Sequence, residues 1–119
     1  MISKEDLIGS WHLESWTIGY SDREDFTYPY GEEPEGLLLY TTDGWMSASI
    51  ARAGREALPE DVSYRKMPDA VKAGAFSSYF HYAGRYRVVD GDVIHQVTQS
   101  LNPNFPGTEQ LRHAELDGQ

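Results

Sequence analysis

His95 is the side chain of this sequence best suited to moving a proton. It occupies the middle of an alternating segment in which Val93 and Val97 share its face. A histidine between two valines is partly removed from water, and such an imidazole could exchange a proton near neutral pH. The alternative is that His95 is a buried, hydrogen-bonded structural residue, and the sequence leaves both interpretations open.

Arg112 is the second candidate, because its guanidinium keeps its charge at every accessible pH. If it points into the protein, it needs a negative partner. That partner is Glu14, an acid of the segment from Asp22 to Glu35, or a carboxylate or enolate on a bound molecule. Paired with an enolate, Arg112 would be catalytic, whereas paired with an internal acid it would be structural.

Period-two alternation extends the candidate site over several strands. In a sheet that closes into a barrel, alternate residues face inward, and apolar content selects the inner face. The inner wall then combines apolar side chains with a few hydrogen-bonding groups, as small-molecule sites do. Ordinary core filling is the competing interpretation for the tyrosines. The residues predicted to contact a ligand are Tyr40, Trp45, Met46, Tyr82, Tyr86, His95, Gln110 and Arg112.

The sequence contains no motif for cysteine, metal or cofactor chemistry. The chain has no cysteine, which excludes thiolate nucleophiles, disulfides and Cys-containing metal sites. We expect His12 to point outward, His81 to lie at a helix-to-strand junction and His113 to lie opposite the inner face. Because none has ligand spacing near a carboxylate, no metal site is expected. No G-x-S-x-G, phosphate-binding loop or dinucleotide motif occurs, so no cofactor is expected either.

The charge balance narrows the range of partners. Lys and Arg total 10 against 19 Asp and Glu, a formal net charge of -9, so nucleic acid is not an expected partner. The N-terminus lacks a basic region followed by an apolar one, and no run of about 18 apolar residues occurs. We therefore expect no membrane contact. The absence of cysteine fits a reducing, cytoplasmic location.

The 119 residues suit one domain, in which the candidate residues lie on predicted strands. Two Asp-Gly turns, Asp43-Gly44 and Asp90-Gly91, predict tight hairpins. Pro68 marks the start of a helix between them. The predicted elements are helices over 4–8 and 69–79, strands over 10–20, 36–40, 45–50, 82–89, 92–100 and 108–116, and a long loop over 21–34.

Six sequential strands favour an antiparallel up-and-down β-barrel, because closure removes the exposed edges of a sheet. The predicted fold class is therefore all-β, with a short N-terminal helix and one helix inserted between the third and fourth strands. The segment Asp117-Gly118-Gln119 is a turn signal that no strand follows. Either the domain lacks C-terminal strands, or a second chain supplies the missing pairing.

Several segments carry a family resemblance. Gly9-Ser10-Trp11 after a short helix resembles the G-x-W motif that opens the first strand of lipocalins. Residues 30–40, 43–47, 79–86 and 95–112 resemble, in that order, the lipocalin-like domain family of bacteria and fungi. The resemblance implies one lipocalin-like domain over 1–119, a cup-shaped β-barrel that binds a small, largely apolar molecule. It also implies further strands after the last turn, from which this sequence departs.

Three hypotheses about function follow. Binding of a small apolar molecule in the barrel lumen is the leading one. The resemblance also implies an alternative, because some similar domains look like cofactor-free cyclases or isomerases of polyketide-type compounds. In that case His95 would move a proton, and Arg112 or a tyrosine would steady oxyanion charge. The third hypothesis is a homo-oligomer formed through unpaired strand edges.

Overall fold

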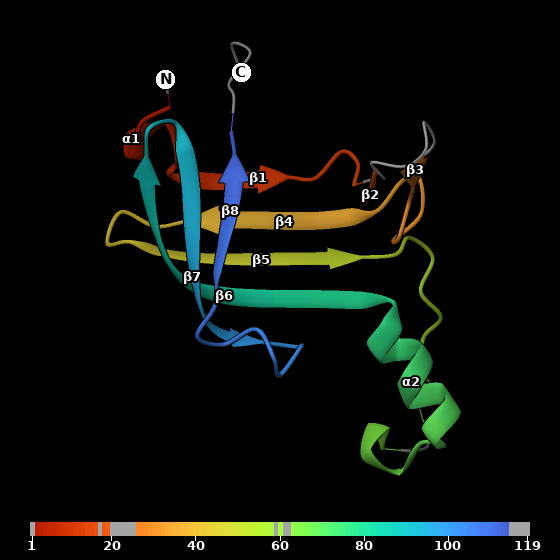
Figure 1. The fold of residues 1–119 in the computed structure, drawn as a ribbon. Coiled ribbons are helices and arrows are strands. Elements are labelled where there is room, and N and C mark those ends of the chain that lie inside the picture. The colour runs from red at the N-terminus through yellow and green to blue at the C-terminus, as the bar shows by residue number, and fades with distance from the viewer. Residues whose placement is uncertain (1, 17, 20–25, 59, 61–62, 115–119) are drawn as a thin grey trace.

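The structure of the chain, a computed structural model, describes residues 2–16, 18–19, 26–58, 60 and 63–114 (Figure 1). Strands form one sheet of six and one of two. Within this part of the chain, no helix has the length and apolarity needed to cross a membrane. The elements are α1 (Lys4–Leu7), β1 (Gly9–His12), β2 (Ile18–Gly19), β3 (Phe26–Thr27), β4 (Glu35–Tyr40), β5 (Trp45–Ala51), the 3-10 helix η1 (Tyr64–Lys66), α2 (Asp69–Ser77), β6 (Tyr79–Val89), β7 (Asp92–Ser100) and β8 (Glu109–His113).

Both predicted Asp-Gly hairpins are confirmed. β4 pairs with β5 across the first turn, in which Gly44 has a φ of 93°. β6 pairs with β7 across the second, in which Asp90 and Gly91 have φ values of 52° and 84°. In the second turn, positive φ at both central residues gives a twist that matches that of the flanking antiparallel strands, whereas the first turn has positive φ at Gly44 and not at Asp43. The two hairpins bring the predicted site residues of four strands onto one sheet.

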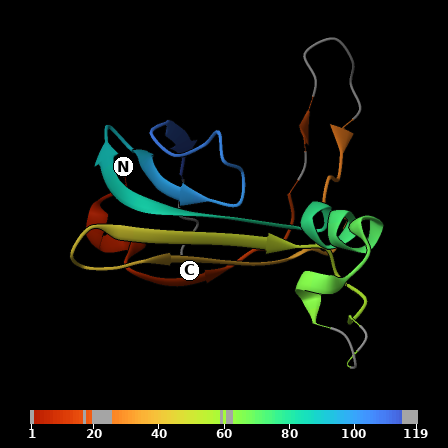
Figure 2. The same ribbon diagram turned by 90° about the horizontal axis from the view of Figure 1, so that it is seen from below.

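The six-stranded sheet curls on itself. Its order is β1-β4-β5-β6-β7-β8, and all neighbours are antiparallel. β6 bends along its length and carries β7 and β8 across the front of β4 and β5 (Figure 1), a curl that Figure 2 shows from below. Among the described residues, β1 and β8 are the edges of the sheet and do not pair with each other. The up-and-down topology is confirmed, whereas the predicted closed barrel appears here as an open, concave sheet.

Gly84 lies at a close approach of the β6 and β7 backbones. The register of the two strands shifts between Ala83 and Gly84, which marks a β-bulge. A Cβ atom on residue 84 would lie 2.0 Å from the main-chain oxygen of Gln96. Bulges increase the local twist, and glycine is the residue that permits such an approach of two backbones. The bend of the sheet therefore depends on this glycine.

The chain after β1 differs from the prediction. The strand predicted over 10–20 is wrong in extent, since β1 ends at His12 and a separate strand, β2, follows. β2 pairs with β3, which lies in the segment predicted as loop. Trp16 stacks on Tyr30 with ring centroids 5.1 Å apart, so this segment is held by a side-chain contact and does not continue the first strand. The end of the strand predicted over 108–116 lies outside the described residues.

The concave face of the sheet carries the core, and the predicted inward alternation is confirmed for β4 to β7. α1 covers one end of it with Leu7, and Ile2 packs there too. A capping box opens α1, since the Ser3 N–H donates to a carboxylate oxygen of Asp6 at 2.9 Å. The buried side chains of β4 to β7 are Tyr40, Met46, Ile50, Tyr82, Tyr86, Val93, His95 and Val97.

Candidate functional site

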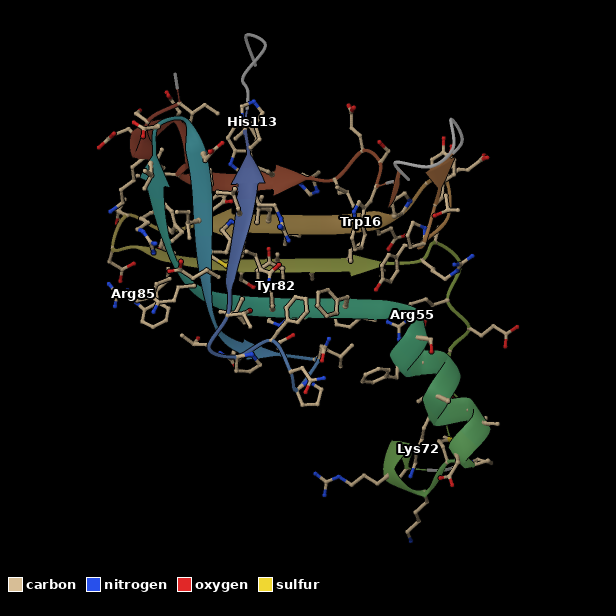
Figure 3. The ribbon with its side chains drawn as sticks, in the orientation of Figure 1. Trp16, Arg55, Lys72, Tyr82, Arg85 and His113 are labelled. Carbon is tan, nitrogen blue, oxygen red and sulfur yellow. The ribbon has the colours of Figure 1, made fainter. Side chains whose placement is uncertain are left out.

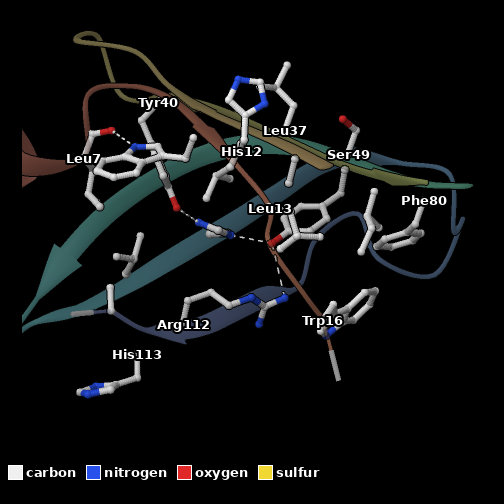
Figure 4. Close-up of a pocket in the computed structure, with 18 of the residues that line it drawn as sticks. Leu7, His12, Leu13, Trp16, Leu37, Tyr40, Ser49, Phe80, Arg112 and His113 are labelled. Carbon is white, nitrogen blue, oxygen red and sulfur yellow. Dashed lines mark hydrogen bonds between the residues drawn. The ribbon is translucent and has the colours of Figure 1, made fainter. Parts of the chain in front are cut away.

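His95 lies between two tyrosine hydroxyls inside the curled sheet. β7 places the imidazole on the concave face, where the residue is only 2% exposed. Its Nε2 atom is 2.6 Å from the hydroxyl of Tyr40 on β4, and its Nδ1 atom is 2.7 Å from the hydroxyl of Tyr82 on β6. Dashed lines in Figure 4 trace this chain of contacts from Tyr40 to Arg112. The three side chains link β4 to β6 and β7 across the concave face, although β5 lies between β4 and β6 in the sheet.

The imidazole of His95 is neutral at physiological pH. Burial, together with the smaller effect of the positive charge of Arg112, lowers its pKa to about 4. This low pKa argues against the expectation that His95 exchanges a proton near neutral pH. The structure favours the other interpretation, a buried histidine whose two nitrogen atoms are both hydrogen bonded.

One tyrosine hydroxyl hydrogen in this group remains available to a ligand. A neutral imidazole donates from one nitrogen and accepts at the other. One of the hydroxyls of Tyr40 and Tyr82 therefore donates to His95, and the other accepts from it and keeps its own hydrogen. This count holds for either tautomer. Burial raises the pKa of both hydroxyls, so both stay protonated and can donate.

Arg112 extends the group toward the edge of the sheet. It lies on β8 and is exposed, and one guanidinium nitrogen donates to the Tyr82 hydroxyl at 3.4 Å. The other terminal nitrogen donates to the main-chain oxygen of Leu111 at 3.0 Å. Among the described residues, no carboxylate forms an ion pair with it, so the predicted pairing with Glu14 is not found. Three of the predicted alternative partners, Asp22, Glu24 and Asp25, lie outside the described residues.

A cavity of about 770 Å³ opens along the concave face, within the size range of small-molecule sites (Figure 4). All six strands of the large sheet contribute to its walls. Of the residues predicted to contact a ligand, four line it: Tyr40, Tyr82, His95 and Arg112. The remaining lining residues are Ile2, Leu7, Trp11, His12, Leu13, Trp16, Leu37, Leu38, Ala48, Ser49, Ile50, Phe80, Val93, His113 and Ala114.

Trp45 does not line the cavity. Its side chain is 42% exposed, and the guanidinium of Arg85 lies 4.7 Å from its ring centroid. Arg85 lies away from Tyr82, at the outer side of the curl (Figure 3). Alternation explains the difference, because Met46 takes the inward position next to Trp45 in β5.

The other three predicted contact residues also lie away from the cavity. Met46 and Tyr86 are buried in the adjoining core. The Tyr86 hydroxyl donates to the main-chain oxygen of Thr41 at 2.6 Å. The side-chain amide of Gln110 donates to the Thr108 hydroxyl at 3.0 Å. These residues support the walls without facing the cavity.

Several residues that line the cavity were not predicted from the sequence. Leu13 and Trp16 follow β1 and are no longer part of an extended strand, so alternation of inward and outward residues does not predict their direction. Phe80 lies in the part of β6 that the prediction had assigned to a helix and a junction. Trp11 was visible in the G-x-W motif, which is the one signal that could have found a member of this group.

The remaining histidines lie at the margin or outside the cavity. His12 and His113 line its edge and are exposed, and Nδ1 of His113 is 3.0 Å from a carboxylate oxygen of Asp92. The Nε2 atom of His81 is 2.9 Å from the Ser47 hydroxyl. Within the described ranges, no group of three His, Asp or Glu side chains is arranged to hold a metal ion.

Comparison with known proteins identifies the family. No curated protein and no solved structure matches the chain. The family model described as "Lipocalin-like domain" matches residues 8–119. This match covers nearly the whole sequence and includes every strand of the curled sheet. It agrees with the concave antiparallel sheet and its internal cavity, and the chain belongs to the lipocalin-like domain family.

Proposed function

We propose that this protein binds one small, largely apolar molecule in the cavity of its curled sheet. The observation that carries the proposal is the composition of the walls. Leucine, alanine, isoleucine and aromatic side chains make up most of them, and the polar groups of Tyr40, Tyr82, His95 and Arg112 are gathered on one side. Apolar walls with a few oriented polar groups are what a small organic ligand requires.

The empty volume also supports a bound ligand. Protein interiors are normally packed as densely as organic crystals, with few voids larger than a water molecule. Here the inward residue at the centre of β5 is Ala48, flanked in register by Leu38 and Tyr82. A larger residue at this position would fill space that the chain leaves open. Binding of an apolar molecule would remove the exposed walls from water.

The hydrogen bonds of His95 favour binding over turnover. A proton-transferring histidine must present a nitrogen to its substrate and change its charge near the working pH. Both nitrogens of His95 are engaged by Tyr40 and Tyr82, and its pKa of about 4 keeps it neutral. We therefore assign this group to orienting a ligand, and the isomerase or cyclase hypothesis has no observation in its favour.

A titration with N-phenyl-1-naphthylamine, a neutral apolar fluorophore, tests the proposal. We expect one saturable site per chain with a blue-shifted, enhanced emission. The substitution Ala48→Phe, which places a ring in the cavity, should weaken binding at least about tenfold. Ala48→Leu should give a smaller loss. Ala73→Phe is the matched control, since Ala73 lies exposed on α2, and it should leave binding unchanged.

Two results would contradict the proposal. One is the absence of saturable binding to the native protein. The other is undiminished binding by Ala48→Phe, provided that urea unfolding shows the variant to be cooperatively folded. If that variant does not fold, Ala48→Leu takes its place, and undiminished probe binding by Ala48→Leu contradicts the proposal in the same way.

A further inference from the structure

We propose that the ligand is an organic anion, a flat apolar body carrying one carboxylate, sulfonate, or acidic enol or phenol group that is held by Arg112. This inference rests on the proposed function, because it concerns the same cavity. It goes further by naming the chemical class. Three features of the cavity carry it: its charges, its hydrogen-bond donors and the distribution of its aromatic side chains.

The charged side chains that line the cavity have one sign, which is positive. Arg112 lines it, whereas no Asp or Glu does among the described residues. In the same part of the chain, no carboxylate pairs with the guanidinium, although the sequence carries 19 acidic residues and a formal net charge of -9. An arginine left without a carboxylate in so acidic a protein is suited to a negative group from outside.

The hydrogen-bonding groups near Arg112 are donors. Arginine has five N–H donors, and Arg112 uses one on the Tyr82 hydroxyl and one on the main-chain oxygen of Leu111. The hydroxyls of Tyr40 and Tyr82 add one hydrogen that His95 does not need, whichever tautomer it adopts. A ligand that approaches this side of the cavity therefore meets several N–H and O–H donors. Such a set is complementary to an anionic oxygen.

The aromatic side chains in the cavity walls favour a flat, aromatic body. Trp11, Trp16 and Phe80 line the cavity, and Phe80 and Tyr82 pack with ring centroids 6.0 Å apart. Aromatic faces and edges offer large contact areas to other planar rings. The cavity thus has a cationic, donor-rich side next to Arg112 and an aromatic remainder, which matches a molecule with one acidic group at one end.

Two fluorophores with the same skeleton test this inference. N-phenyl-1-naphthylamine is neutral, and 1-anilinonaphthalene-8-sulfonate is the same molecule with a sulfonate. We expect the sulfonate to bind at least about tenfold more tightly and to displace the neutral probe from one shared site. Arg112→Met should remove that advantage and change the affinity for the neutral probe less than about twofold. Arg112→Lys keeps the positive charge but lacks the paired N–H donors of a planar guanidinium. It should retain part of the tighter binding of the sulfonate.

Arg87→Met is the control for a general loss of positive charge. Arg87 lies on β6, outside the cavity, and its guanidinium is 3.0 Å from a carboxylate oxygen of Glu109. This substitution should leave the preference for the sulfonate unchanged.

The outcomes separate the two proposals. Three results would overturn the anion inference and leave the proposed function standing. The first is equal affinity of the native protein for the two probes, and the second is an equal loss of affinity for both probes in Arg112→Met. The third is binding of the sulfonate that does not displace the neutral probe. If neither probe binds saturably to the native protein, the proposed function fails and the anion inference falls with it.

Discussion

Replacing Gly84 by alanine is expected to destabilise the fold by about 3–5 kcal/mol, a large part of the roughly 5–15 kcal/mol that stabilises a typical domain. The new Cβ atom would lie 2.0 Å from the main-chain oxygen of Gln96 and 3.0 Å from the main-chain nitrogen of Thr98. Both are backbone atoms of β7, so no rotamer change relieves the overlap. β6 and β7 would have to separate at the bulge that gives the sheet its curl.

Gly74→Ala is the matched control for this substitution. Gly74 lies in α2, and a Cβ atom there would have no neighbour within 4 Å. Because alanine is the better helix former, this variant should be more stable than the native chain by about 0.5–1 kcal/mol. Urea unfolding monitored by tryptophan fluorescence and circular dichroism measures both. A native-like midpoint for Gly84→Ala would show that the close approach of β6 and β7 is not as described.

Lowering the pH from 7 to 4 is expected to cost the protein about 3 kcal/mol of stability through His95 alone. The pKa of His95 is about 4 in the folded chain, against 6.5 as its ordinary value. Between these values the unfolded chain binds a proton that the folded chain does not. The free energy of unfolding therefore falls as the pH falls through this window. Below the folded pKa both states carry the proton, and the loss stops.

The comparison with His95→Gln isolates this contribution from that of the carboxylates. Glutamine keeps one donor and one acceptor for Tyr40 and Tyr82 but does not titrate. We expect the variant to be less stable at pH 7 and to lose about 3 kcal/mol less than the native chain between pH 7 and pH 4. Parallel pH profiles for the two proteins, measured by urea unfolding, would refute the assignment of His95 as the buried neutral group.

Local sequence patterns predicted much of the fold, for reasons that the structure makes plain. The glycine of each Asp-Gly pair takes the positive φ that the turn needs, so both hairpins could be placed without knowing the rest of the chain. Alternation then assigned the inward face of β4 to β7 correctly. The break after β1 could not be predicted, because it depends on Trp16 stacking on Tyr30, a contact between side chains distant in the sequence.

Part of the candidate site could likewise be predicted from the sequence, and part could not. Alternation placed His95, Tyr82 and Arg112 on one inner face, and all three line the cavity, with Arg112 on the edge strand β8. It could not predict that two tyrosine hydroxyls would occupy both nitrogens of His95, which depends on how the sheet curls. Nor could it separate Trp45 from Met46, because both flank the same turn and both are large and apolar. In the structure Met46 faces the interior, and Trp45 lies beside Arg85 on the outer side.

Intermolecular nuclear Overhauser effects from bound N-phenyl-1-naphthylamine test the central claim most directly, since they report where an apolar molecule sits. The account predicts contacts from the naphthyl protons to the methyl groups of Ala48 and Leu38 and to the ring of Phe80, which line the cavity. Contacts confined to exposed side chains outside it, such as Leu111 at 62% exposure, would contradict the account.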